Sequence, residues 1–158
     1  MLQEPTYEKM IQMRMRGLAE AWIEQQKDPN ITELTFDERL GLLIDAESLY
    51  RENKRMQRNL REAKLRLSSA CIEDIDYSAK RKLDKKLVRQ LATCKWIKLH
   101  QNIVITGMTG VGKSYLACAL GQQACRKGHR VLYRRVSRLF DELALAHADG
   151  SYPRLLTK

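Results

Sequence analysis

The most informative residues of this chain are 103–114, which read Ile-Val-Ile-Thr-Gly-Met-Thr-Gly-Val-Gly-Lys-Ser. The first four form a β-branched run that is short enough for a buried strand. The last eight match the Walker A pattern G-x-x-x-x-G-K-[ST], and a stretch typical of a helix follows up to Lys127. Strand, glycine loop and helix in this order are the context that the pattern requires, so these residues predict a site for the phosphates of a nucleotide.

Each residue type in the glycine loop has a physical reason. Glycines tolerate positive φ and leave room for backbone N–H groups to surround an anion, and the following helix adds the positive end of its dipole. We expect Lys113 to bridge the β- and γ-phosphate oxygens and Ser114 to place its hydroxyl on Mg²⁺. The predicted nucleotide-binding residues are Gly107, Met108, Thr109, Gly110, Val111, Gly112, Lys113, Ser114 and Tyr115.

The residues after the loop continue the pattern of an α/β domain. Gly128 stands in the cap position of the first helix, residues 131–136 predict a second strand, and Ser137 is placed to cap a further helix that ends at Gly150. The predicted fold class is therefore α/β. It consists of a helical N-terminal region followed by the first half of a three-layer α/β/α P-loop NTPase domain at residues 99–158.

Residues 1–70 predict a helical module. Apolar side chains recur at helical spacing over residues 6–27, before a break at Pro29. Thr35 and Glu38 form a capping box that starts a second helix. That helix carries a heptad seam of Leu42, Ala46, Leu49, Asn53, Met56, Leu60, Ala63 and Leu67. We expect the module to pack as a hairpin or small bundle, or to serve as an oligomerisation surface.

Residues 71–98 predict a connector and a basic helix. The acidic residues at 71–77 are interpreted as a solvated loop rather than a metal site. Ser78 or Asp76 is expected to cap the helix, whose apolar positions are Leu83, Leu87 and Leu91. A basic amphipathic helix can lie on a membrane or on DNA, and the lack of bulky aromatic residues on its apolar face favours DNA.

Positive charge is concentrated in the middle of the chain. There are 29 Lys and Arg against 19 Asp and Glu, a net charge of +10, although residues 1–50 are net acidic. This asymmetry points to a polyanionic partner. The cations opposite the heptad seam and those around the basic helix form either solvated surfaces or faces that contact phosphates. The DNA-binding candidates are Arg51, Lys54, Arg55, Arg58, Arg61, Lys82, Lys85, Lys86 and Arg89.

The sequence argues against several classes of protein. No stretch approaches the roughly 18 consecutive apolar residues of a membrane span, and the first residues lack the pattern of a signal peptide. The cysteines show no C-x-x-C pair and are interpreted as reduced core residues of a cytoplasmic protein; they are Cys71, Cys94, Cys118 and Cys125.

Several stretches together resemble one known family. They are Leu-Thr-Phe-Asp-Glu-Arg-Leu at 34–40, Arg-Glu-Asn-Lys-Arg at 51–55, Cys-Ile-Glu-Asp-Ile-Asp-Tyr at 71–77, Ile-Thr-Gly-Met-Thr-Gly-Val-Gly-Lys-Ser-Tyr-Leu-Ala-Cys-Ala-Leu-Gly at 105–121 and Asp-Gly-Ser at 149–151. The chain resembles the IstB-like family, ATP-binding helper proteins encoded beside the transposase in a class of bacterial insertion sequences. These are AAA+ relatives of the DnaC-type helicase loaders. Met108 departs from the family pattern, in which Pro is frequent there.

The resemblance implies ATP and Mg²⁺ as cofactors and an AAA+ domain behind the helical region. It also implies assembly into a homo-oligomer on duplex DNA, with little sequence preference, and assistance to the transposase. Two alternatives stay open: a loader of a replicative helicase, and a non-enzymatic remnant that only binds DNA.

The resemblance also predicts what the chain does not do. Residues up to Lys158 contain no Walker B strand, sensor or arginine finger, so the catalytic residues are unknown and we expect weak or no ATPase activity. In the AAA+ strand order 5-1-4-3-2, the strands predicted at 103–106 and 131–136 would not be neighbours. Both would be edges without a partner.

Overall fold

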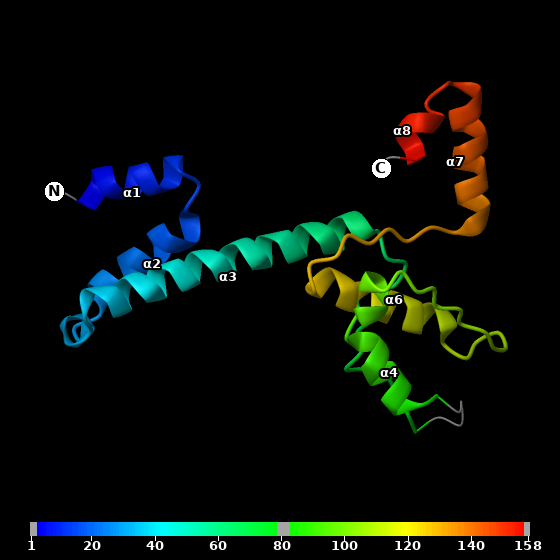
Figure 1. Cartoon of the computed structure of the whole chain (residues 1–158), viewed down its shortest axis with the longest axis horizontal. Coiled ribbons are helices and arrows are strands. Elements are labelled where there is room, and N and C mark those ends of the chain that lie inside the picture. The colour runs from blue at the N-terminus through cyan, green and yellow to red at the C-terminus, as the bar shows by residue number, and fades with distance from the viewer. Residues whose placement is uncertain (1–2, 79–82, 157–158) are drawn as a thin grey trace. The chain divides into compact units, whose positions relative to one another are not determined.

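The computed structural model describes residues 3–78 and 83–156, which form helices joined by loops and extended segments (Figure 1). The chain divides into two compact units, Met1–Asn59 and Leu60–Lys158. The first unit contains α1 (Gln3–Gln12), α2 (Arg16–Lys27), the 3-10 helix η1 (Ile31–Glu33) and most of α3 (Phe36–Ala63). The second contains the end of α3, α4 (Lys85–Ala92), α5 (Lys95–Lys98), α6 (Lys113–Arg126), α7 (Val136–Ala148) and α8 (Tyr152–Leu156).

The single helix predicted at 6–27 is in fact two helices, α1 and α2. Arg14 adopts a left-handed conformation with φ of 60°. Its N–H donates to Ile11 O at 2.9 Å, and the next N–H, of Met15, donates to Met10 O at 2.9 Å. This pair of hydrogen bonds is a Schellman motif, which closes α1. The sequence did not reveal this motif because its left-handed position usually holds glycine, whereas here it holds Arg14.

The capping box predicted at the start of α3 is confirmed. The Thr35 N–H donates to Glu38 Oε2 at 2.8 Å, and the Glu38 N–H donates back to Thr35 Oγ1 at 3.3 Å. These hydrogen bonds hold the pKa of Glu38 below its ordinary value. The reciprocal pair is purely local, which is why the sequence alone reveals it.

Helix α2 packs on α3 at Gly17, through a face beside the heptad seam. A Cβ on Gly17 would lie 2.5 Å from Tyr50 Cβ and 2.9 Å from Ala46 O, so only glycine allows this crossing. Leu43 on this face is buried, whereas Leu42 and Leu49 of the seam keep 53% and 59% of their surface exposed. The hairpin expected in this unit is therefore present, but its contact does not use the whole seam.

Glu47 fixes the start of α2 from the middle of α3. Its Oε2 accepts from the Leu18 N–H at 3.1 Å, and its Oε1 accepts from Arg51 Nε at 2.6 Å. The residue before α2, Met15, provides no side-chain cap, so this buried carboxylate satisfies the helix N-terminus instead. Burial acts to raise the pKa of Glu47, but the hydrogen bonds from Arg51 and Leu18 outweigh it and the pKa is lowered.

The second unit is organised around α6. Its core consists of Ala70, Cys118 and Ala119, against which Leu65, Ile72, Tyr115 and Tyr133 pack. Helix α4 also packs on α6, and Gln123 Nε2 donates to Ala92 O at 3.3 Å. The cap expected at Ser78 or Asp76 is wrong: α4 begins at Lys85, and Asp84 caps it by accepting from the Lys86 N–H at 2.7 Å. Leu83 therefore precedes the helix instead of belonging to it.

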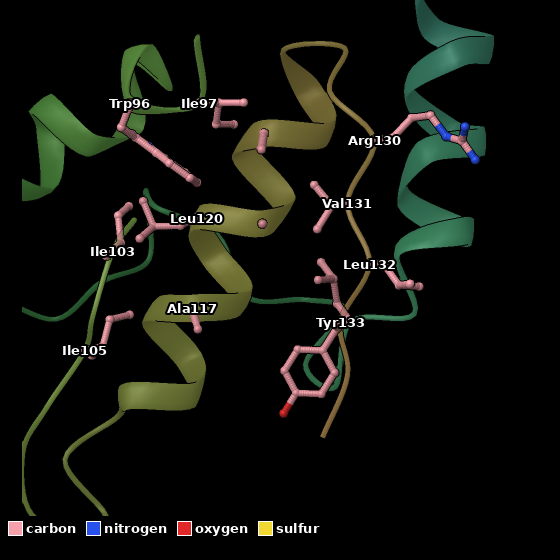
Figure 2. A pocket seen from close by; sticks show the side chains of 13 residues that line it. Trp96, Ile97, Ile103, Ile105, Ala117, Leu120, Arg130, Val131, Leu132 and Tyr133 are labelled. Atoms are coloured by element: carbon pink, nitrogen blue, oxygen red, sulfur yellow. The ribbon is translucent and has the colours of Figure 1, made fainter. Parts of the chain in front are cut away.

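The two predicted strands are extended segments that form no β-ladder in the described part of the chain. Residues 103–106 and 131–135 lie near the same face of α6 but are separated from each other; in Figure 2, Ile103 and Ile105 lie to one side of this helix and Val131 and Tyr133 to the other. A cavity of about 400 Å³ lies between them, lined also by Leu120 and Trp96. The sheet of the predicted α/β class is thus not observed, because a strand requires a neighbouring strand to donate and accept its hydrogen bonds.

The second helix after the glycine loop also differs in detail. Helix α7 begins two residues earlier than a cap at Ser137 predicts, at Val136, and Arg135 precedes it without a side-chain cap, so Ser137 is not the cap. Its end is as expected, since Gly150 follows with φ of 73°.

No helix among the described residues is long and apolar enough to cross a membrane.

Replacing Glu47 by glutamine is expected to destabilise the first unit by about 1–3 kcal/mol, because the α2 N-terminus and Arg51 lose a buried negative charge. The folded-state pKa lies below the unfolded one, so the stabilisation is present above the unfolded-state pKa and is lost as the pH falls through the folded-state pKa. Urea unfolding followed by circular dichroism across this range measures both effects. Glu20→Gln, an exposed change on α2, is the matched control, and equal stability of the two variants would contradict the capping role.

Candidate nucleotide site

The glycine loop adopts a conformation that only glycines sustain without strain. Gly107, Gly110 and Gly112 have positive φ values of 148°, 86° and 92°, which are disfavoured for residues that carry a Cβ. A Cβ on Gly107 would also lie 3.3 Å from Val111 Cγ2. Gly112 is the N-cap of α6, so the loop leads directly into the helix. The predicted order of glycine loop and helix is confirmed.

Lys113 is oriented by the loop itself. Its Nζ donates to Gly107 O at 2.9 Å and to Met108 O at 2.6 Å. An ammonium group has a further N–H, which remains for an incoming oxygen. The lysine therefore stays at the loop as a positive charge, which suits the phosphate role that the sequence predicts.

The start of α6 adds polar groups to the same place. Gly112 offers no side-chain cap, and the first backbone N–H groups of any helix lack intrahelical acceptors. Together with the helix dipole they attract an anion. Ser114 is exposed in the first turn. The described residues contain no group of three or more His, Cys, Asp or Glu that could hold a metal ion.

A cavity of about 340 Å³ lies beside the loop, within the usual range of about 300–1,000 Å³ for small-molecule sites. Most of its lining comes from the loop and from α6: Ile105, Thr106, Gly107, Met108, Val111, Gly112, Lys113, Tyr115 and Leu116. Two further residues, Ile75 and Leu83, come from the segment before the domain. Sequence reasoning missed both. For Ile75 the sequence does hold a signal: Ile72 and Ile75 interrupt the acidic residues of 71–77, and apolar side chains in a loop indicate that part of it packs on the protein.

The connector at 71–77 is attached to α6 rather than free in solvent. Tyr115 OH donates to Cys71 O at 3.4 Å, and Arg126 Nη1 donates to Glu73 Oε1 at 2.7 Å. A backbone hydrogen bond and Arg126 hold the pKa of Glu73 below its ordinary value. The Cys71 thiol donates to Asp74 Oδ2 at 2.9 Å, which raises the pKa of Cys71. Glu73 therefore joins the connector to α6, while Glu73, Asp74 and Asp76 stay exposed, as the sequence-based interpretation of a solvated loop expects.

A family model described as "IstB-like ATP binding protein" matches residues 8–158. The chain belongs to this IstB-like family. Membership supports an AAA+ type of P-loop fold for the second unit, although its sheet is not observed.

All four cysteines of this family member are free, and burial raises the pKa of Cys94 and Cys125, so these two thiols stay protonated.

Relatives of the IstB-like chain include an insertion sequence IS1162 putative ATP-binding protein of Pseudomonas fluorescens, 47% identical over 99% of this chain and 68% of the relative. The putative insertion sequence ATP-binding proteins y4pL and y4uH of Sinorhizobium fredii are 46% and 41% identical; this chain covers 63% and 60% of their lengths, with 98% and 96% of its own residues aligned. The chain thus spans slightly under two thirds of the length of the two Sinorhizobium relatives.

The DNA-binding candidates of this IstB-like chain lie on two helices, α3 and α4. On α3, all five candidates are exposed; Arg51 is in addition paired with Glu47, and Lys54 Nζ lies 5.6 Å from the centre of the Tyr50 ring. On α4, the exposed cations are Lys85, Lys86 and Arg89, and Lys85 lies 5.3 Å from the centre of the Tyr77 ring. Lys82 falls outside the described residues.

Replacing Lys113 by alanine is expected to weaken ATP binding about 100-fold, because each charge-assisted hydrogen bond to a phosphate is worth about 1.5–3 kcal/mol. Titration calorimetry with ATP and Mg²⁺ measures the change. Lys127→Ala, an exposed change at the other end of α6, is the matched control and should bind ATP normally. Equal affinity of both variants would remove Lys113 from the site.

Proposed function

We propose that the chain is the nucleotide-binding part of an ATP-dependent helper of insertion-sequence transposition. In this proposal it binds ATP with Mg²⁺, contacts duplex DNA with little sequence preference, and assists a transposase. The observation that supports the first step is the glycine loop, in which Lys113 Nζ donates hydrogen bonds to two loop carbonyls. The names of the relatives, insertion sequence ATP-binding proteins, support the biological setting.

The residues of the loop account for binding and orientation of the triphosphate. Backbone N–H groups around Gly110 and Gly112 surround the phosphates, and Lys113 neutralises part of their charge. Ser114 is the residue that would hold Mg²⁺, which supplies charge neutralisation to the β- and γ-phosphates. The residue that positions an attacking water in related ATPases is not one of these, so the described site explains binding rather than hydrolysis.

The DNA step rests on charge. The chain has a net charge of +10, and exposed arginines and lysines follow α3 and α4. Cations of this kind contact phosphates and do not read bases, so they give affinity without sequence preference. Oligomerisation on DNA and recruitment of a transposase complete the proposal. Affinity capture from cells that carry the insertion element tests the partner: a bound transposase supports it, and a bound replicative helicase instead would favour the helicase-loader alternative.

Replacing Lys85, Lys86 and Arg89 together by glutamine is expected to weaken binding to unrelated duplexes equally. The slope of log affinity against log salt should fall by about 0.9 for each phosphate contact removed. Fluorescence anisotropy at several salt concentrations measures both quantities. The control is Lys9, Arg16 and Lys27 changed to glutamine, which removes the same charge from exposed positions of α1 and α2.

Two results would count against DNA binding through phosphate contacts of α4. If the control variant lost as much affinity as the α4 variant, net charge alone would explain binding. If the chain preferred one duplex sequence strongly, base contacts would have to replace the phosphate contacts.

A further inference from the structure

A long stretch of the second unit contains cations and no carboxylates. Residues 85–140 hold no Asp and no Glu, although the chain has 19 in its 158 residues, a frequency that would place about seven in this stretch. The same residues hold twelve Lys and Arg, and they include all of α4, α5 and α6. Carboxylates repel phosphates and pair with cations, so a surface built from this stretch attracts a polyanion strongly.

Four exposed cations of this stretch lie around the C-terminal end of α6. Lys127 is the C-cap of the helix. The chain then turns at Gly128, which has φ of 84°, so Arg130 follows directly after the helix end. Two further cations belong to α5. We call this set the α6 rim, and its members are Lys95, Lys98, Lys127 and Arg130.

Helix α5 is held at the same end of α6. It follows α4, whose last residue accepts the hydrogen bond from Gln123 of α6. Burial raises the pKa of Cys94, and the charge of Lys127 acts against this rise, so Lys127 lies near the residue that precedes α5. Trp96 of α5 lines one cavity with Arg130; in Figure 2, Trp96 lies to one side of α6 and Arg130 to the other.

Carboxylates do not neutralise the α6 rim in the described part of the chain. Lys95 and Lys98 are three positions apart, so they share one face of α5. No ion pair is formed by any rim residue within residues 3–78 and 83–156, whereas the neighbouring Arg126 is paired with Glu73 at 2.7 Å. The dipole of α6 stabilises positive charge at its C-terminal end, so the fold tolerates these cations without carboxylate partners.

The cations of α3 have a different electrostatic setting. Glu52 and Glu62 lie among them on the same helix, and Arg51 is already paired with Glu47. Exposed charges within about 8 Å of each other interact at physiological salt, so these carboxylates weaken the attraction of α3 for phosphates. The α6 rim has no such neighbours in its own stretch of sequence.

We propose that the α6 rim contacts the phosphates of duplex DNA and contributes more to this binding than α3 does. The proposal rests on the DNA binding proposed above and places it on residues outside the α3 and α4 candidates. Proteins hold single strands by stacking bases on exposed aromatic rings. Trp96, the aromatic residue of α5, is half-buried and its Nε1 donates to Leu91 O at 2.9 Å, so this ring is held by the protein. The cations of the rim therefore suit the backbone of a duplex.

The position of the α6 rim separates DNA from the nucleotide. The glycine loop leads into the first residue of α6, Lys113, and the rim surrounds the other end of the helix. At a rise of about 1.5 Å per residue, the 14 residues of α6 separate the two ends by about 20 Å. Substitutions in the rim should therefore leave the affinity for ATP unchanged.

The test compares two variants that lose the same charge. The rim variant carries Lys95→Gln, Lys98→Gln, Lys127→Gln and Arg130→Gln; the matched control carries Lys54→Gln, Arg55→Gln, Arg58→Gln and Arg61→Gln at exposed positions of α3. Fluorescence anisotropy with unrelated duplexes at several salt concentrations measures affinity and its salt dependence. The rim variant should bind about 10- to 100-fold more weakly, and the α3 variant should lose less than about 3-fold. Unchanged ATP affinity shows that both variants are folded.

Acetylation of the unaltered chain gives a readout that requires no variant. A limited amount of an amine-reactive reagent acetylates exposed lysines, and mass spectrometry measures the rate at each position. Duplex DNA should slow acetylation of Lys95, Lys98 and Lys127 several-fold and leave Lys9 of α1 unchanged. ATP with Mg²⁺ should protect Lys113 and leave the rim lysines reactive.

The outcomes separate the α6 rim from DNA binding in general. If the unaltered chain binds no duplex at low salt, the proposed DNA binding fails and the rim proposal fails with it. If the α4 variant described above loses affinity while the rim variant binds normally, DNA binding stands and the rim is wrong. Equal losses for the rim and α3 variants would also overturn the proposal, because net charge alone would then explain binding. Tighter binding of single strands than of duplexes would overturn it as well.

Discussion

Close approach to α6 is the constraint on which the second unit depends. The helix carries small side chains where other segments meet it, and Cys118, Ala119, Ala124 and Cys125 are buried. At Gly121, a Cβ would lie 3.1 Å from Leu65 Cδ2 and 3.4 Å from Val131 Cγ1, so these two side chains lie against the helix where glycine leaves room for them. Interiors pack too densely to absorb larger side chains at such places. The connector, α4 and both extended segments depend on this one helix for their positions.

The same helix links the core to the candidate site. Its first residue is Lys113, and its buried face holds the connector that carries Ile75. The glycine loop and the connector that carries Ile75 are therefore positioned by the same helix. Binding sites supported in this way keep their geometry better than sites formed by loops alone.

Features that depend on neighbouring residues could be predicted from the sequence, and features that depend on distant residues could not. The capping box at Thr35 and the glycine loop are local patterns, and both are present. The cap that Glu47 provides to α2 joins Leu18 and Glu47, which are 29 positions apart, and no local sequence pattern predicts such a contact. Ile75 and Leu83 were missed for the same reason. The two predicted strands fail differently: their β-branched residues do favour an extended backbone, but a sheet requires partners that this part of the chain does not provide.

The hydrogen bonds of Lys113 to the loop carbonyls have a consequence for the thermodynamics of recognition. A free lysine side chain loses up to about 2 kcal/mol of rotamer entropy when it is fixed in one place. Here Gly107 and Met108 restrict the ammonium during folding, before any phosphate is present. Part of the ordering cost is thus met by the fold and not by association. Because the ammonium group donates hydrogen bonds to these two carbonyl oxygens, Lys113 also stabilises the conformation of the loop.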